Sequence, residues 1–269
     1  MKTLTTSDFF SSQGERQVMK IGRFLSEYAA YLLGCGATCA RLEKNVGRMA
    51  DAWQVSVTMT IMPRHIHLTV CDKEGDGTFT FIAAIRNTLI SYDINTRLSK
   101  LSWEVADQGI DVGNAIRLFN KIKETPPANK WWVLLVASLA NAAFCRLFGG
   151  DFVAVGIVFM ATLAGYYLKQ MLVEVRMDIR LVFIVCAFVS SVLGATDGLF
   201  TLGSTPSIAL GTSVLYMVPG IPFLNAFSDM IDGHYICFFS RLVNAVVLTC
   251  CLSIGLYGGM LLMNVRMFS

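Results

Sequence analysis

The residues best suited to chemistry lie in an apolar stretch in the last quarter of the chain. Pro219 and Pro222 stand inside a segment long enough to cross a bilayer, and a proline has no backbone N–H to donate. The carbonyls four residues earlier, at Leu215 and Val218, should therefore lose their helical partners. Unpaired carbonyls are costly in hydrocarbon unless they face protein or water. The pattern predicts a broken helix that binds a polar substrate or an ion, and a merely kinked helix is the alternative.

Polar side chains follow this break at helical spacing. Asn225 and Asp229 lie four residues apart and hence on one helix face, and Arg241 lies near the start of the next apolar segment. A desolvated Asp beside an Arg can hold a substrate, carry a proton or make a structural pair, and all three roles stay open. The predicted substrate or ion pathway comprises Pro219, Gly220, Pro222, Asn225, Asp229 and Arg241. Weaker candidates of the same kind are Asn141, Asp197, Asp232 and Asn244.

The composition is too apolar for an ordinary soluble enzyme. Of the 269 residues, 54% are hydrophobic and 15% are charged, against about 25% charged in a typical soluble chain. Residues 131–269 hold only 6 of the 22 Lys and Arg and 6 of the 19 Asp and Glu. Because charge is scarce where apolar residues dominate, a disordered chain, a nucleic-acid binder and a disulfide-held secreted domain are excluded. A membrane protein with a soluble N-terminal domain remains.

Five apolar segments follow a short stiff linker at 125–130, which contains two consecutive prolines. Each segment approaches the ~20 residues that cross a hydrocarbon layer. Trp131 and Trp132 place two indoles where a bilayer interface favours them. We therefore predict an α-helical membrane protein with a small cytoplasmic α+β domain at 1–125 and a membrane domain at 126–269, whose five transmembrane helices span about 131–149, 152–168, 181–200, 206–228 and 237–263.

The distribution of cations sets the expected orientation. Seven Lys and Arg residues lie near segment ends on the side of the N-terminus, namely Lys121, Lys123, Lys130, Lys169, Arg176, Arg180 and Arg241. Two lie on the other side, Arg146 and Arg266. Because Lys and Arg resist translocation, we expect the N-terminus in the cytoplasm and, after five crossings, the C-terminus outside.

Hydrophobic periodicity predicts the element order ααβββαα in the N-terminal domain. A helical period runs through two segments, strict alternation or a bounded apolar run follows in three, and a helical period then returns in two. The expected helices are 17–33, 41–53, 94–105 and 112–122, and the expected strands are 55–61, 65–71 and 78–85.

Two patterns in this domain imitate a metal site. The turn 72–77 resembles the start of a calcium loop, but its twelfth position would be Ala83 instead of a bidentate Glu. His65, His67 and Cys71 share one strand face, yet no further ligand cluster accompanies them. The eight cysteines show no disulfide framework. We therefore predict reduced thiols, no metal site and no cofactor.

Four motifs make the chain resemble the threonine/serine exporter (ThrE) family, in the short form of that family. They are LGCGATCARLE at 33–43, LFGGD at 147–151, VPGIPFLN at 218–225, and DMIDG at 229–233 with Arg241 downstream. The resemblance covers nearly the whole chain. Its most specific part is the Pro-Gly-x-Pro-x-x-Asn element followed by Asp, Gly and Arg.

The resemblance implies export of small metabolites across the bacterial inner membrane, driven by the proton gradient or the membrane potential. Because longer family members carry additional C-terminal spans, it also implies a smaller membrane subunit that completes the exporter, in an oligomer surrounded by membrane lipids. Arg41 and Glu43 match the N-terminal motif of the family, either as site residues or as a structural ion pair or cap.

The favoured function is therefore one subunit of a secondary exporter for threonine, serine or a C4-dicarboxylate such as succinate. In this mechanism the freed carbonyls and Asn225 coordinate the substrate, Asp229 is the switchable charge, and Arg241 is its partner or binds a carboxylate. The alternative is a membrane-anchored enzyme or sensor whose N-terminal domain carries the activity. Residues 1–130 lack a Ser-His-Asp spacing, a glycine-rich phosphate loop and a zinc signature, so we predict no enzyme activity.

Overall fold

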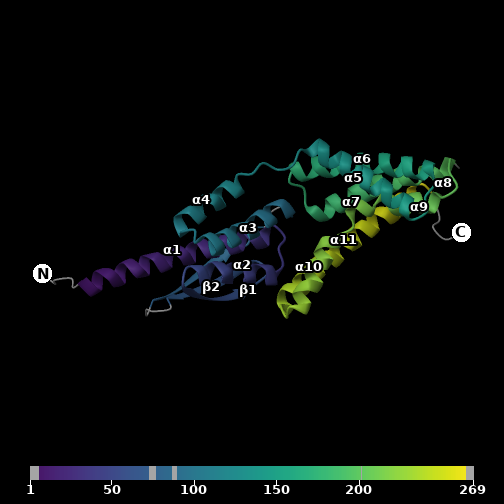
Figure 1. The fold of residues 1–269 in the computed structure, drawn as a ribbon. Helices are drawn as coiled ribbons and strands as arrows, with labels where there is room; N and C mark the ends of the chain where they lie inside the picture. Colours follow the sequence, from purple (N-terminus) through teal and green to yellow (C-terminus); the bar gives the residue numbers. More distant parts are fainter. Residues whose placement is uncertain (1–5, 73–76, 87–89, 201, 265–269) are drawn as a thin grey trace. The chain divides into compact units, whose positions relative to one another are not determined.

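The computed structural model describes residues 6–72, 77–86, 90–200 and 202–264, with side chains from residue 14 onward. It is mostly helical, and the described residues contain one three-stranded sheet (Figure 1). The chain divides into two compact units. The first unit comprises Met1–Pro126 and Phe223–Leu242, and the second unit comprises Pro127–Pro222 and Val243–Ser269.

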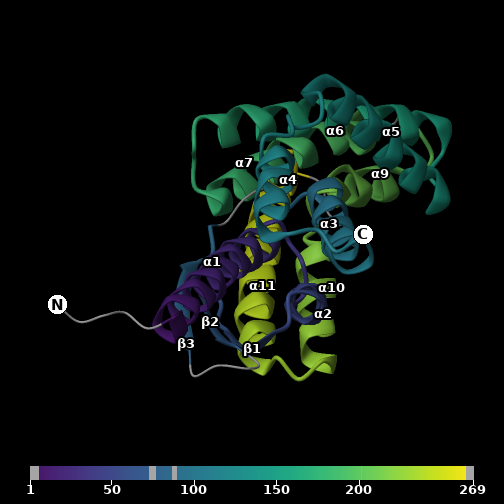
Figure 2. The ribbon, with the colours of Figure 1, turned by 60° about the vertical axis from the view of Figure 1, so that its left-hand side comes forward.

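The first unit begins with the predicted order ααβββαα. Its elements are α1 (Thr6–Gly34), α2 (Cys39–Ala52), β1 (Val55–Ile61), β2 (His65–Asp72), β3 (Thr78–Ala84), α3 (Tyr92–Gln108) and α4 (Val112–Lys123). It also takes in most of α10 (Gly220–Ile231) and the first residues of α11 (Tyr235–Leu262), two helices joined by a short turn (Figure 2).

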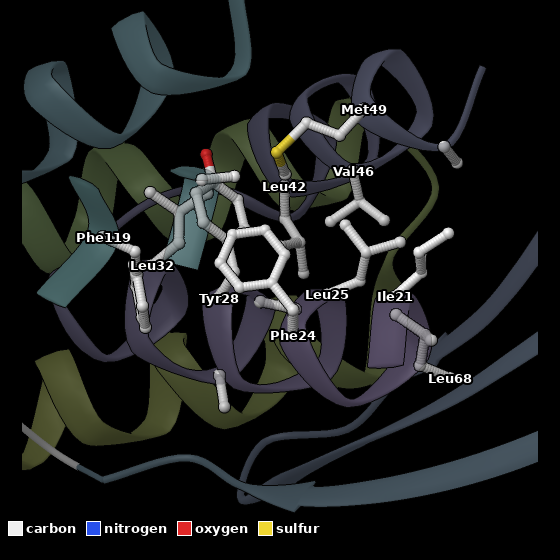
Figure 3. Packing of buried hydrophobic residues seen from close by; sticks show 14 of the residues in the cluster. Ile21, Phe24, Leu25, Tyr28, Leu32, Leu42, Val46, Met49, Leu68 and Phe119 are labelled. Carbon is white, nitrogen blue, oxygen red and sulfur yellow. The ribbon is translucent and has the colours of Figure 1, made fainter. Parts of the chain in front are cut away.

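The core of the first unit lies between its sheet and its helices. The three strands form an antiparallel sheet in the order β1-β2-β3, with Thr69 of β2 opposite Thr58 on one side and Thr80 on the other. α1 packs on β2 and β3, and α2 packs on β1 and α3. Alternate residues of β2 are buried as the period of a strand requires. Together with α1, α2, α3 and α4 they enclose an apolar cluster that includes Ile21, Phe24, Leu25, Tyr28, Leu32, Leu42, Val46, Met49, Leu68 and Phe119 (Figure 3).

The second unit is a bundle of helices. Its elements are α5 (Lys130–Leu147), α6 (Phe152–Glu174), α7 (Ile179–Gly194), α8 (Thr196–Phe200), α9 (Pro206–Ser213), the 3-10 helix η1 (Leu215–Met217) and α11 from Val243 onward. α6 lies against α5, α7 and α9. Small residues permit close helix packing: a Cβ on Gly255 of α11 would lie 2.3 Å from the carbonyl oxygen of Ile184 in α7.

Large apolar side chains lie on the outside of the second unit, and its interior contains polar side chains beside its apolar clusters. Trp131, Trp132, Phe152 and Met160 are each at least 60% exposed. The buried polar residues are Ser138, Asn141, Thr162, Ser190, Ser191, Asp197, Thr212 and Ser213. Such a surface is unfavourable in water and suits hydrocarbon, where polar groups turn toward the interior of a bundle. The second unit therefore has the side-chain distribution of a membrane protein.

The prediction of five membrane-crossing helices is met in part. Four helices among the described residues are long and apolar enough to cross a bilayer: Lys130–Leu147, Phe152–Glu174, Ile179–Phe200 and Tyr235–Leu262. A fifth crossing is obtained only if Pro206–Met217 and Gly220–Ile231, which meet at a bend of 61°, count as one span.

The compact units group one segment of the predicted membrane domain with the N-terminal elements, and the membrane boundary itself stays a prediction. A boundary near 125 separates the N-terminal elements from α5, but Phe223–Leu242 also joins these elements. The physical reason is that this segment carries polar side chains that bond to the turn between α1 and α2. A prediction made from apolar composition cannot detect hydrogen bonds of this kind.

Candidate functional site

A short turn between α1 and α2, residues 35–38, forms one side of the candidate site. Gly36 has a φ of +90°, a left-handed conformation that favours glycine, and a Cβ there would lie 2.9 Å from the Ile90 side chain. Thr38 is the N-cap of α2, and its hydroxyl accepts a hydrogen bond from the Arg41 amide at 3.4 Å. The glycine and the threonine therefore fix the path of the backbone through the turn.

Proline and glycine determine where α10 begins. The helical conformation ends before Pro219, and α10 starts at Gly220. Pro222 lies in the first turn of α10, where a helix needs no N–H donor. Asn225 and Asp229 follow on one face of this helix, one turn apart, and both reach the α1–α2 turn.

Three predicted site residues on α10 and α11 converge on the backbone of this turn. Each makes one hydrogen bond of 2.9 Å: Asn225 Nδ2 donates to the Gly36 carbonyl, Arg241 Nη2 donates to the Ala37 carbonyl, and Asp229 Oδ1 accepts from the Cys39 amide. The site therefore joins two segments that are about 190 residues apart in the sequence.

The charges of Asp229 and Arg241 neutralise each other. Asp229 Oδ2 lies 3.1 Å from Arg241 Nη1, although these two atoms are not aligned as a hydrogen bond. The Asp229 side chain is fully buried and that of Arg241 is 24% exposed. Asp229 also lies at the N-terminus of α2, where the helix dipole favours a negative charge. A cation, an amide and a helix end thus compensate the desolvation of this carboxylate.

Two thiols lie beside the ion pair. Cys39 is fully buried and shares a hydrogen bond with Cys237, whose thiol also donates to the Ile61 carbonyl at 3.6 Å. The hydrogen bond with Cys237, burial and the negative charge of Asp229 raise the pKa of the Cys39 thiol far above its usual value. Both residues are free cysteines, so Cys39 is a neutral thiol at physiological pH.

Arg41 and Glu43 each contact a residue of another element instead of each other. Arg41 Nη1 donates to Asn95 Oδ1 at 3.2 Å, and Glu43 Oε2 lies 3.4 Å from His234 Nε2. Within the described residues, a structural ion pair between Arg41 and Glu43 is therefore not present. Glu43 adds a second polar contact between α2 and the turn that joins α10 to α11.

The prediction of freed carbonyls at the helix break is wrong. The Val218 amide donates to the Leu215 carbonyl at 3.1 Å, and the Gly220 amide donates to the Val218 carbonyl at 2.8 Å. A 3-10 turn and a three-residue turn around Pro219 replace the α-helical bonds that the prolines remove. The helix is broken as predicted, but the carbonyl oxygens of Leu215 and Val218 both accept hydrogen bonds.

The weaker candidates lie in different surroundings. Asn141, in the second unit, donates to Thr162 Oγ1 at 2.6 Å and to the Thr212 carbonyl at 3.1 Å. Asp197 is fully buried there, with Oδ1 accepting from the Gly203 amide at 2.7 Å and Oδ2 unpartnered among the described residues. Asp232 and Asn244 are exposed, so the structure does not bring them into the site.

Sequence reasoning missed the backbone groups of the α1–α2 turn and the start of α2 that bond to the predicted side chains. The bonds are made to the backbone carbonyls of Gly36 and Ala37 and to the backbone amide of Cys39. A pattern of side-chain types does not identify such backbone groups. The available signal was the presence of two separate motifs, 33–43 and 218–225 with its polar continuation. The structure brings these two motifs together.

The described part of the chain offers no group of three or more His, Cys, Asp or Glu side chains that could hold a metal ion. His65 and His67 lie next to each other with ring centroids 5.1 Å apart. Residues 73–76 of the calcium-like turn lie outside the described residues.

Comparison with known proteins identifies the family. The family model described as "Putative threonine/serine exporter" (ThrE) matches residues 23–263, so the chain belongs to this family. Two relatives are both named "Probable succinate transporter subunit YjjP". The one from Escherichia coli K12 is 32% identical over 93% of this chain and 97% of its own length, and the one from Klebsiella aerogenes is 29% identical over 91% and 95%. No solved structure matches the chain.

Family membership decides between the two classes of function left open by the sequence. The family and both relatives are transporters, which are not enzymes. Together with the apolar exterior of the second unit, this makes the chain a membrane protein of a transporter family.

Proposed function

We propose that the chain is one subunit of a bacterial secondary exporter that moves threonine, serine or a C4-dicarboxylate such as succinate out of the cytoplasm. Membership of the exporter family and similarity to two transporter subunits support this proposal. The observation that carries it is the second unit, which combines an apolar exterior, buried polar side chains among its apolar clusters and a broken helix. A polar metabolite crosses hydrocarbon only where a protein supplies polar groups inside it.

In this proposal residues 126–269 form the inner-membrane domain and residues 1–125 lie on the cytoplasmic side. The cations near the helix ends favour this orientation because they resist translocation. With the bent pair counted as one crossing, five crossings put the C-terminus outside.

A smaller membrane subunit completes the exporter in this proposal, and the proton gradient or the membrane potential drives it. The word "subunit" in the names of both relatives supports a partner. The broken helix at Pro219, Gly220 and Pro222 is the proposed point of substrate passage.

We assign a positioning role to Asn225, Asp229 and Arg241. All three are already engaged with the α1–α2 turn, so direct substrate contact would require them to break these bonds. They instead set the position of α10 and the start of α11 against the first unit's helices.

The proposal is tested by export from cells in which the chromosomal gene is deleted or restored, so that any partner subunit remains present. Cells are preloaded with radiolabelled succinate, threonine or serine, and efflux is followed with and without a dissipated proton gradient. Restoration should speed the efflux of at least one substrate, and loss of the gradient should slow it. Equal efflux of all three substrates in the deleted and restored strains would reject the exporter proposal.

A further inference from the structure

One cation inside the second unit has no acidic partner. Lys169 lies on α6, is partly buried, and forms no ion pair with any described residue. Its Nζ lies 5.4 Å from the ring centroid of Tyr166 and 5.8 Å from that of Phe183 on α7. The ammonium group therefore points between two helices of the bundle and is only partly compensated, by aromatic faces.

The carboxylates of the second unit are all engaged elsewhere. Glu174 pairs with Lys130, Asp178 caps α7, Asp151 caps α6, and Asp197 accepts from Gly203. These are the only four acidic residues in this part of the sequence. Among the described residues of this unit, Lys169 therefore has no carboxylate as a counter-ion.

Two hydroxyl groups near the helix break are linked to this lysine through the ring of Tyr166. The ring of Tyr166 lies 5.9 Å from that of Tyr216, which belongs to η1 at the break, and the Tyr216 hydroxyl is 2.9 Å from Ser190 Oγ. Gly165 makes room for both hydroxyls, because a Cβ there would lie 2.1 Å from Ser190 Oγ and 2.2 Å from the Tyr216 oxygen. Gly165 and Lys169 are four residues apart on α6, so the lysine and the hydroxyl pair share one helix face.

We propose that Lys169, with the Tyr216 hydroxyl, whose hydrogen is free when Ser190 Oγ donates to it, binds a carboxylate group of the exported metabolite. This inference rests on the proposed export function and identifies the recognised group as a carboxylate, which succinate, threonine and serine all carry. An ammonium group and a neutral hydroxyl donor complement a carboxylate by charge-assisted hydrogen bonds. A lipid phosphate is the competing anion, but it would approach from the membrane–water interface, whereas the Lys169 ammonium group lies near the rings of Tyr166 on α6 and Phe183 on α7.

The test measures concentration-dependent uptake of [14C]succinate, and of [14C]threonine, into inside-out membrane vesicles from the restored strain. Lys169→Gln should raise the KM roughly tenfold or more, because it removes one charge-assisted hydrogen bond. Lys169→Arg should stay within about threefold of the wild type, and Tyr216→Phe should raise the KM about threefold without changing the protein level. Lys130→Gln is the matched control, since it removes a lysine of the same unit that already has a partner.

The outcomes separate this inference from the export function. If wild-type vesicles take up neither succinate nor threonine above the deletion strain, and take up no [14C]serine in the same assay, the proposed function is rejected together with the inference. If wild-type vesicles are active and Lys169→Gln keeps the wild-type KM, or loses rate equally at all concentrations while inserted at the wild-type level, the inference alone is overturned. If Lys169→Gln fails to insert, Tyr216→Phe decides: a raised KM supports the site and an unchanged KM rejects it.

Discussion

The two units differ in the side chains that they expose. Both enclose apolar clusters and bury some polar groups, but large apolar side chains are exposed mainly on the helices of the second unit. Water drives apolar burial in the first unit, and in lipid the same driving force is absent between helices. Close packing at glycines and interhelical hydrogen bonds must hold the second unit together.

The units also differ in how they treat an interior charge. In the first unit Asp229 has a cation, an amide and a helix end around it. In the second unit Lys169 has aromatic rings and no carboxylate among the described residues. A charge whose counter-ion belongs to the protein stabilises a fixed structure. A charge without a counter-ion in the protein is suited to bind a charged ligand.

The largest effect on this comparison is expected from Asp229→Asn. The change leaves the Arg241 charge without its partner, and breaking a buried pair costs about 3–5 kcal/mol of unfolding free energy, near the lower end here because Arg241 is partly exposed. Hydrogen exchange of the α2 amides in the full chain measures the loss. The exposed Asp232→Asn is the matched control, within about 0.5 kcal/mol of the wild type. Equal protection in both variants would contradict the ion-pair assignment.

A pair of identical substitutions compares the polar interiors of the two units. Asn45 donates to Tyr28 and Ser99 in the first unit, and Asn141 donates to Thr162 and the Thr212 carbonyl in the second. Asn45→Leu should cost about 2 kcal/mol because buried partners lose their bonds. Asn141→Leu should cost about 0.6 kcal/mol, the average for interhelical bonds in a membrane. Hydrogen exchange in α2 and in α6 measures the two effects, and a larger effect for Asn141 would reverse the comparison.

Gly36→Ala tests the backbone of the α1–α2 turn. A side chain at a φ of +90° is strained and would contact Ile90, so we expect a loss of about 1–2 kcal/mol. Thermal unfolding of the purified full chain measures it. Gly47→Ala, in helical conformation with open space at its Cβ, should be neutral or stabilising. A similar decrease for both variants would show that the left-handed turn is not the cause.

The smallest expected effect is the pH-dependent stabilisation by Asp151, which lies in the loop before α6 of the second unit. Hydrogen bonds from the Ala154 and Ser204 amides lower the pKa of Asp151 below its usual value. The stabilisation is therefore present above the unfolded pKa of about 3.9 and disappears as pH falls through the lower folded pKa. Asp151→Asn should lower the thermal unfolding temperature slightly at pH 7, and the difference from the wild type should shrink toward pH 3. A difference that grows in acid would contradict this assignment.

Local patterns predicted most of the elements, because helical and strand periods act over neighbouring residues. The order ααβββαα, the helix break after Val218 and the shared face of Asn225 and Asp229 all follow from such patterns. The convergence of α10 on the α1–α2 turn did not follow, since no local rule connects Asp229 with Cys39. The prediction of freed carbonyls was wrong because other amides donate to them: the Val218 amide bonds to Leu215 and the Gly220 amide bonds to Val218. A proline in the sequence shows which donor is missing, but it does not show which amide replaces it.

A single helix, α11, contributes to both units. Its 28 residues extend about 42 Å at 1.5 Å per residue. Near the start of the helix, Arg241 donates a hydrogen bond to the Ala37 carbonyl. At Gly255, the Ile184 carbonyl of α7 lies too close for even a methyl group on the glycine. One continuous helix therefore carries both the bond to the α1–α2 turn and, fourteen residues further along, the tight crossing with α7.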